Sequence, residues 1–376
     1  MFVDKPTYYL FWTPPDNIMK RHKLYIPLIA VILAVLSACS SAPTKQEKQA
    51  VAPAKPQVSQ QQAYRYPPSQ LPAMKSLGVF PKPSALEPAV DFWRKTYGVW
   101  RRSEVAFYDD RYMDVIYEVM VLPGSVGEGL TNEQKEIVSR RKEYWKSQLT
   151  ALDFKVRARV PLNPFEKQLH AKLQNSRNKA FVLAGASERL RSQRGIKERF
   201  KRGLEISGRY DSQFRKIFRE YSLPEDFAFL PHVESSFQAS AKSSAGAVGM
   251  WQFTRGAAET FMPNNNKPDR RHDPIVSAHG AARYLRHAYN KLGDWPTAVT
   301  SYNHGINGMK RAQNQIGNDF ARIVQSYNSP LFGFDSRNYY AQFLAARDIA
   351  SNPMAYFREG VSYERPMVRA QYLAAE

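Results

Sequence analysis

The stretch "SLPEDFAFLPHVESSF", residues 222–237, carries a third carboxylate, Glu234, within the mainly apolar run that follows Glu225 and Asp226. Ser222 is followed three residues later by Glu225, which is the spacing of a capping box. This pattern predicts a helix that begins near Leu223, with a proline tolerated in its first turn. The following apolar residues predict that the helix is packed into a core.

Glu234 is expected on the apolar face of this helix, just after a kink at Pro231. A carboxylate at such a position has two interpretations. It is a structural acid that a cation or backbone donors neutralise, or an acid whose pKa is raised by burial so that it keeps a proton for catalysis. The position alone leaves both open. Steps of four and three residues define the face as Leu223, Phe227, Leu230, Glu234 and Phe237.

Further motifs follow in order along the chain. A Ser- and Gly-rich loop contains Ser243 and ends in "GMWQF", residues 249–253. After it come "DRRHDPIVSAHGAARYL" at 269–285, "TSYNHGINGM" at 300–309 and "FGFDSRNYYAQFLAA" at 332–346.

Together with "ESSF", these strings resemble the lytic transglycosylases that have a goose-type lysozyme (SLT) catalytic domain. The ordered matches fall within residues 222–360, and "RLRSQRGIKERFKRGLEISGRY" at 189–210 is typical of the membrane-bound D-type branch. The resemblance implies a mainly α, lysozyme-like fold. It also implies cleavage of the bond between N-acetylmuramic acid and N-acetylglucosamine in peptidoglycan.

The resemblance assigns a role to individual residues. Without it, Met250 and Tyr302 would be interpreted as core residues, whereas buried amides such as Asn303 demand partners. Tyr340 beside Tyr339 leaves the register of the last motif uncertain by one residue. The family pattern makes Glu234 the catalytic residue and places Ser243, Met250, Gln252, Tyr302, Asn303 and Tyr339 in contact with the substrate.

The family's reaction needs a single carboxylate. Glu234 would act first as acid on the leaving oxygen and then as base on the muramic 6-hydroxyl, which closes a 1,6-anhydro ring. A hydrolase would need a second acid, and Glu259, Asp269 and Asp273 are the nearest candidates in sequence. We expect turn and capping roles for the two aspartates. A lysozyme-like muramidase and a catalytically silent murein-binding lipoprotein remain the alternatives.

Other residue patterns indicate which cofactors and partners are to be expected. No dinucleotide fingerprint, P-loop or metal-ligand histidine cluster occurs, so no cofactor and no metal is expected. The formal net charge of +20 favours an acidic partner. The export signal described next argues against nucleic acid and leaves peptidoglycan or a lipid surface, with cell-wall assembly proteins as further partners.

The N-terminus predicts export and lipidation. Residues 1–38 are interpreted as a signal peptide with a charged start at Met19, residues 1–18 being a mis-assigned start. "LSAC" resembles a bacterial lipobox, and the single cysteine, Cys39, would carry the lipid. Ser40 after it implies an outer-membrane lipoprotein that faces the periplasm in a Gram-negative cell. Residues 39–84 are expected to form a disordered tether.

The rest of the chain is expected to be mainly helical. Residues 85–215 form a helical N-terminal region with a short β-hairpin over 103–124 and a capping box at Thr131 and Gln134. Helical pattern continues through 187–210, whose many cations are either a solvated face or a surface for substrate. The catalytic domain is placed at 216–360 and a tail at 361–376. Ser336 is expected to cap the last helix, and one apolar face is predicted for Ala278, Ala281, Leu285, Ala288 and Leu292.

Overall fold

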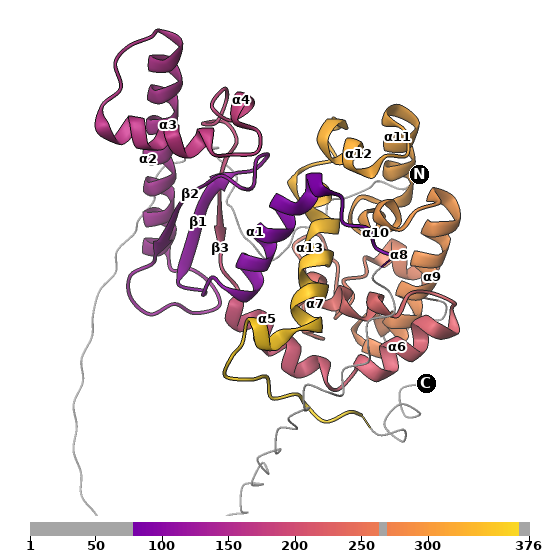
Figure 1. The fold of residues 1–376 in the computed structure, drawn as a ribbon. Helices are drawn as coiled ribbons and strands as arrows, with labels where there is room; N and C mark the ends of the chain where they lie inside the picture. Colours follow the sequence, from indigo (N-terminus) through magenta and orange to yellow (C-terminus); the bar gives the residue numbers. More distant parts are fainter. Residues whose placement is uncertain (1–77, 263–268, 368–376) are drawn as a thin grey trace, which may run out of the picture. The chain divides into compact units, whose positions relative to one another are not determined.

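The computed structural model describes residues 78–262 and 269–367 and is mainly helical with one small sheet (Figure 1). The predicted signal peptide, Cys39 and most of the predicted tether lie outside the described residues. None of the helices in the described ranges is long and apolar enough to cross a membrane. The strands are β1 (Glu104–Asp109), β2 (Ile116–Val121) and β3 (Leu190–Arg194). The helices are α1 (Glu87–Gly98), α2 (Asn132–Arg157), α3 (Pro164–Gln174), α4 (Lys179–Val182), α5 (Lys197–Ser207), α6 (Asp211–Glu220), α7 (Leu230–Glu234), α8 (Arg255–Phe261), α9 (Pro274–Leu292), α10 (Trp295–His304), α11 (Ile306–Ile316), α12 (Phe320–Ser326) and α13 (Phe334–Ser351), with 3-10 turns η2 (Ser84–Leu86), η3 (Glu225–Phe229), η4 (Arg270–His272) and η5 (Pro353–Ala355).

Helix α13 is the centre of the larger apolar core. Its side chains are buried on nearly every face, as expected for a helix that other helices surround. It packs against α1, α7, α10 and η3, and α1 lies alongside it in Figure 1. Helix α13, the last long helix of the described chain, therefore packs directly against α1, the first.

The sheet is antiparallel with strand order β2-β1-β3, and the predicted hairpin between β1 and β2 is confirmed. The side chains of β1 alternate between two apolar clusters. Val105 and Phe107 belong to a smaller cluster with α2, α3 and α4, whereas Ala106 and Tyr108 belong to the larger core. The two faces of one strand thus connect the two cores.

The helix expected through residues 187–210 is wrong in its first part. Leu190–Arg194 form β3, in which Arg194 lies opposite Val105 of β1, and the helix begins only at Lys197. Helix propensity is a weak prior that tertiary contacts override. Here a strand more than 80 residues earlier in the chain supplies the hydrogen-bond partners that a helix would have supplied locally.

The segment 222–237 also differs from the expected single helix. Ser222 has a left-handed φ of 55° and makes no cap, so the predicted capping box is wrong. The segment is instead divided into η3 and α7, each with a proline at or just before its first turn. Pro231 therefore starts a helix and does not kink one, because its missing N–H is harmless only at such a start.

The apolar stripe predicted for this segment is correct in burial but incomplete. All five predicted positions are buried, yet Ala228, Phe229, Pro231, His232 and Val233 are buried too. From Asp226 to Phe237 every residue is buried, so the periodicity does not define a single inward face.

Other helix predictions are confirmed or corrected individually. The capping box of Thr131 and Gln134 starts α2. Ser336 is not a cap: it lies inside the first turn of α13, after Gly333 at the N-cap. All five residues of the face predicted for α9 are buried.

Residues near the expected domain boundaries take part in the core. Phe80 is buried between Phe227 and Phe343, although the sequence placed it in the tether. Val361, in the expected tail, is buried as well. The packed body of the described chain thus includes both positions.

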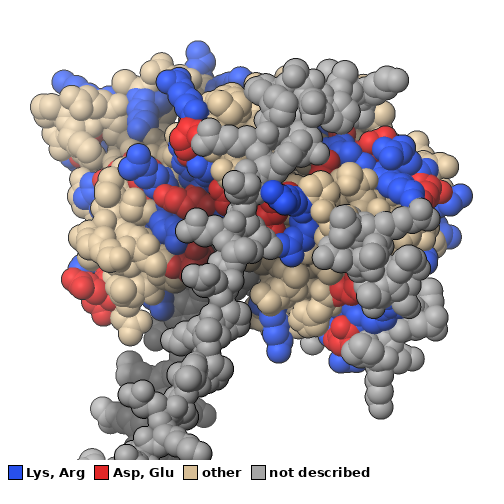
Figure 2. All heavy atoms as spheres, turned by 90° about the horizontal axis from the view of Figure 1, so that it is seen from below, with Lys and Arg blue, Asp and Glu red and all other residues tan. Residues whose placement is uncertain are grey.

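Several cations of α5 and of the turn that follows it are matched by nearby acids. Arg202 and Arg209 both pair with Glu364, and Lys201 pairs with Glu359. Figure 2 shows Lys and Arg interspersed with Asp and Glu on one face of the molecule. These pairs favour a solvated, charge-balanced helix surface over a cationic surface for substrate.

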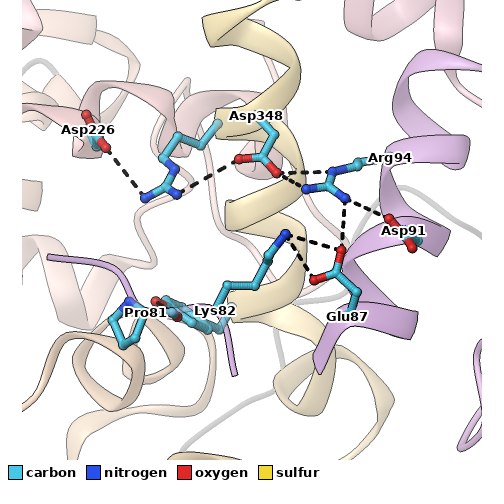
Figure 3. A network of polar contacts seen from close by, with 9 residues as sticks. Pro81, Lys82, Glu87, Asp91, Arg94, Asp226 and Asp348 are labelled. Atoms are coloured by element: carbon cyan, nitrogen blue, oxygen red, sulfur yellow. Dashed lines mark hydrogen bonds and ion pairs between the residues drawn. The ribbon is translucent and has the colours of Figure 1, made fainter. Parts of the chain in front are cut away.

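An ion-pair network joins α1 to α13 (Figure 3). Arg94 binds Asp348 through Nε at 3.0 Å and also pairs with Asp91 and Glu87. On α13, Arg347 lies between Asp348 at 3.9 Å and Asp226 of η3 at 3.7 Å. The network fixes α1 and η3 on the same central helix.

Candidate functional site

Glu234 is the last residue of the short helix α7, and the chain turns sharply after it. The next residues leave the helix through two consecutive left-handed conformations, with φ of 53° at Ser236 and 60° at Phe237. Such conformations are strained for residues with a side chain and persist only where the surroundings impose them. The Phe237 N–H donates to the Pro231 carbonyl oxygen at 3.1 Å, and Ser235 Oγ donates to the Met250 carbonyl oxygen at 2.8 Å. The position of the acid is therefore firmly defined.

The Glu234 carboxyl is buried, with only 8% of the residue exposed. Tyr339 of α13 donates its hydroxyl hydrogen to Oε1. Burial raises the pKa of Glu234 to about 8, and the Tyr339 hydrogen bond opposes this rise. At neutral pH the carboxyl therefore holds a proton that it could transfer to an adjacent basic atom.

Two more tyrosines surround the carboxyl. Tyr302 of α10 donates to the Trp251 carbonyl oxygen at 2.9 Å, and Tyr97 of α1 donates to Gln342 Oε1 at 3.4 Å. Burial, followed by the nearby Glu234 charge, raises the pKa of both phenols well above the usual value. Both hydroxyls therefore stay protonated, and the carboxyl lies among neutral aromatic groups.

The predicted residues Ser243, Met250 and Gln252 all lie in the loop before α8, and Met250 contacts the turn after Glu234. The Ser243 hydroxyl accepts the Ala247 N–H at 3.0 Å, and Gln252 Nε2 donates to the Gly249 carbonyl oxygen at 2.8 Å. The Met250 side chain is buried, and its carbonyl oxygen holds Ser235. Some polar side chains of this loop thus form hydrogen bonds within the loop and hold its conformation.

Gly249 cannot be replaced without moving the loop. Its φ is 80°, and a Cβ added there would collide with the Arg271 carbonyl oxygen. The glycine of the "GMWQF" string is thus required by the backbone.

Asn303 has one satisfied and one unsatisfied group. Its Oδ1 accepts the Ser336 hydroxyl at 2.7 Å, while its Nδ2 is buried and has no hydrogen-bond partner within the described ranges. An unpaired buried donor is costly and calls for a partner. A carbonyl oxygen of a ligand would supply one.

Comparison with known families identifies the segment that carries these residues. Residues 213–329 match the model of the "Transglycosylase SLT domain" family. This segment is an SLT domain. It contains Glu234, the Ser243 loop and Asn303.

Two of the three relatives described next carry names that agree with the family match. The chain is 34% identical over 99 residues to a "Putative tributyltin chloride resistance protein" of Alteromonas sp. (strain M-1), covering 26% of this chain and 48% of that protein. It is 29% identical over 143 residues to "Membrane-bound lytic murein transglycosylase D" of Escherichia coli K12, covering 37% of this chain and 30% of the relative. It is 28% identical over 150 residues to "Peptidoglycan transglycosylase gp16" of Escherichia phage T7, covering 39% of this chain and 11% of that protein. The matches thus span less than half the length of each of these relatives, and they place the SLT domain in the lytic transglycosylase family, D-type branch.

Tyr339 lies outside the segment that matches the SLT family, yet it contacts the acid directly. The structure also resolves the register of the tyrosine pair. Tyr339 binds Glu234, whereas Tyr340 points away and donates to the Pro81 carbonyl oxygen at 2.8 Å.

Asp269 and Asp273, the two aspartates considered as a second catalytic acid, stabilise backbone turns, as predicted. Asp273 caps α9 by accepting the N–H groups of Ile275 and Val276. Asp269 binds the guanidinium of Arg271, which lowers the pKa of Asp269 to about 2. Glu259 is exposed on α8.

Sequence reasoning missed two side chains near the site. Arg271, which is buried, donates to the carbonyl oxygens of Gly246 and Phe253 and so pins the loop before α8. Tyr97 lies far from the motifs in sequence. The D-x-R spacing offered a signal for Arg271, but no local pattern pointed to Tyr97.

Proposed function

We propose that the chain is a peptidoglycan lytic transglycosylase that cleaves the bond between N-acetylmuramic acid and N-acetylglucosamine and leaves 1,6-anhydro-muramic ends. The observation that carries the proposal is the buried Glu234 carboxyl, whose pKa is raised to about 8 and which Tyr339 holds by a hydrogen bond. The SLT domain and the names of two relatives support the same substrate and reaction.

In the first step Glu234 acts as the acid. Its proton passes to the glycosidic oxygen while the bond from that oxygen to the muramic C1 breaks, and positive charge develops on the muramic ring. Glu234 becomes a carboxylate at this point. The Tyr339 hydroxyl, which already donates to Oε1, stabilises that anion.

In the second step Glu234 acts as the base. The carboxylate removes the proton from the 6-hydroxyl of the same muramic residue while its oxygen bonds to C1, which closes the anhydro ring and restores the acid. The nucleophile belongs to the substrate, so the reaction consumes no water.

The surroundings of Glu234 favour this mechanism over hydrolysis by two carboxylates. Within the described part of the chain, Tyr339 is the side chain that hydrogen-bonds to Glu234. The candidate second acids are an exposed Glu259 and two aspartates that hold backbone turns. A muramidase would need one of them to activate a water molecule.

Other residues are proposed to hold the glycan. Asn303 Nδ2, which lacks a partner, is suited to an acetamido carbonyl oxygen of the sugar. Ser243, Met250, Gln252 and Tyr302 are proposed as further contacts, of which Ser243 orients the substrate near the acid.

Digestion of purified sacculi with mass spectrometry of the released fragments tests the activity. Anhydro-muramic ends are expected. Reducing ends would instead indicate a muramidase, and no release would indicate a silent murein-binding protein. Glu234→Gln should abolish release while binding to sacculi is retained, and release near that of the natural chain would refute Glu234 as the acid.

We also propose that Cys39 carries a lipid and anchors the protein to the outer membrane on its periplasmic side. The lipobox-like sequence supports this anchor, as does the membrane-bound relative in Escherichia coli. Incorporation of a labelled fatty acid tests it. Cys39→Ala should abolish the label and release the protein from membranes, whereas equal labelling of both forms would contradict the proposal.

A further inference from the structure

Helix α5 lies outside the segment that matches the SLT family, yet it supports the strained turn after Glu234. Arg199 Nη2 donates to the Ser235 carbonyl oxygen at 3.3 Å. A Cβ added at Gly203 would lie only 2.9 Å from the Ser236 carbonyl oxygen, so the bare glycine allows the turn to approach α5 closely. The turn that defines the position of the acid is thus held from outside the matched segment.

A stack of aromatic rings continues from α5 to α1. Phe200 of α5 stacks on His232 of α7 at 4.8 Å, and Tyr97 of α1 stacks on Phe200 at 5.1 Å with an interplanar angle of 16°. All three rings are buried. Burial lowers the pKa of His232 to about 3, so this ring remains neutral and the whole stack carries no charge near neutral pH.

Tyr97 extends from this stack toward the acid. Its hydroxyl donates to Gln342 on α13, three residues after the Tyr339 that binds Glu234. The charge of Glu234 acts on the Tyr97 phenol, which places the two groups within electrostatic reach. Tyr97 thus connects the ring stack that reaches α7 with the turn of α13 that holds the carboxyl.

The charged and titratable groups around α7 come from several elements, and Arg199 is the one among them that bonds a backbone carbonyl oxygen of the turn. Arg347 of α13 lies 3.7 Å from Asp226 of η3, and Tyr97 and Tyr302 remain protonated because burial raises the pKa of both phenols. The groups that approach α7 are His232 on α7 itself, Tyr97 on α1, Arg199 on α5, Asp226 on η3, Tyr302 on α10, and Tyr339 and Arg347 on α13.

We propose that Tyr97 is a positioning residue for Glu234: its ring, held against Phe200, closes the α1 side of the carboxyl to water. The role of the acid in catalysis rests on the proposed function, whereas the exclusion of water does not. It follows that α1 and α5, although they lie outside the matched segment, help to form the surroundings of Glu234 in the SLT domain.

A cycle of four full-length proteins tests this without measuring activity: the natural chain, Glu234→Gln, Tyr97→Ala and the double variant. Their unfolding is followed as a function of pH. The stabilisation by Glu234→Gln grows with pH between the unfolded and folded pKa values of Glu234 and is constant above them, so the upper end of that range, where the growth stops, reports the folded pKa. In the Tyr97→Ala background we expect this upper end to fall by about one pH unit, because water reaches the carboxyl.

Two comparisons control the result. Tyr97→Phe keeps the ring, so the upper end should not fall. Tyr117→Ala removes a tyrosine that is stacked on Trp145 at 5.7 Å in the smaller apolar cluster, and it should leave the range unchanged. Tyr97→Leu is the milder truncation and should shift the range in the same direction if the alanine variant fails to fold. An unchanged range in the truncated Tyr97 variants, or an equal shift in Tyr117→Ala, would overturn the proposal.

The pH profile of sacculus cleavage supplies the second readout. Its upper limb should fall by the same amount in Tyr97→Ala, because that limb reports the acid. If the natural chain does not cleave sacculi, the proposed function fails while the unfolding cycle still tests Tyr97.

Discussion

Glu234 keeps its proton in the folded chain over a pH range in which the unfolded chain releases it. Its pKa rises from an ordinary 4.5 to about 8, so the unfolded state binds fewer protons between these values. Stability therefore falls as pH rises through this range and is unaffected below it. A residue suited to acid catalysis is thus a cost to the fold at neutral pH.

Glu234→Gln should accordingly stabilise the fold as well as abolish cleavage. The amide removes the penalty, which amounts to roughly 3 kcal/mol at pH 7 at about 1.4 kcal/mol per pH unit. Urea unfolding at several pH values measures it. The difference from the natural chain should vanish near pH 4, and a constant difference at all pH values would contradict the raised pKa.

Tyr339→Phe should slow cleavage by about ten- to a hundredfold, because the carboxylate formed in the first step loses its charged hydrogen bond. Since that bond lowers the pKa of Glu234, the upper limb of the pH–rate profile should also move up. The matched control is Tyr340→Phe, whose lost hydroxyl binds only the Pro81 carbonyl oxygen. Equal rates for the two variants would contradict the assigned register.

At the level of residues, sequence reasoning singled out Glu234, whose carboxyl is buried, but not all of the groups packed around it. The motif placed Glu234, Asn303 and Tyr339 because their order along the chain is distinctive. Tyr97 was not predicted, because more than a hundred residues separate it from Glu234 and only folding brings the two regions together. Chemical identity is local in sequence, whereas burial of a carboxyl is a property of everything packed around it.

Among the elements, the loop before α8 depends on a single cation. Arg271→Met should destabilise the fold by about 2–4 kcal/mol, because the buried carbonyl oxygens of Gly246 and Phe253 lose their donor. Urea unfolding measures the loss. The exposed Arg255 provides the control, since Arg255→Met should change stability by less than about 0.5 kcal/mol. Similar losses for both variants would show that Arg271 does not pin the loop.

The predicted elements failed where distant partners or prolines decided the outcome. β3 was expected to be helical, yet its partner β1 lies far earlier in the chain. The helix around Glu234 was expected to be continuous, yet its two prolines create two separate starts. The face of α9 and the capping box of α2 were correct because they depend on neighbours three and four residues apart.

In the molecule as a whole, the α1–α13 junction depends on Arg94. Arg94→Met should cost about 1–3 kcal/mol, because Asp348 and its acidic neighbours lose a partly buried partner. Thermal unfolding measures this loss. The exposed pair of Lys216 and Glu220 is the control, and Lys216→Met should have almost no effect. Loss of the same size in both would contradict the network's role.

The attachment of α1 to α13 also sets the time at which the site can become active. Arg94 and Asp348 are separated by 254 residues, and Glu234 and Tyr339 by 105. During synthesis Glu234 therefore emerges well before the helix that covers it. Until then Glu234 is solvated, has an ordinary pKa and has lost its proton at neutral pH. An incomplete chain thus lacks the protonated carboxyl, and the surroundings of Glu234 are complete only once α13 is in place.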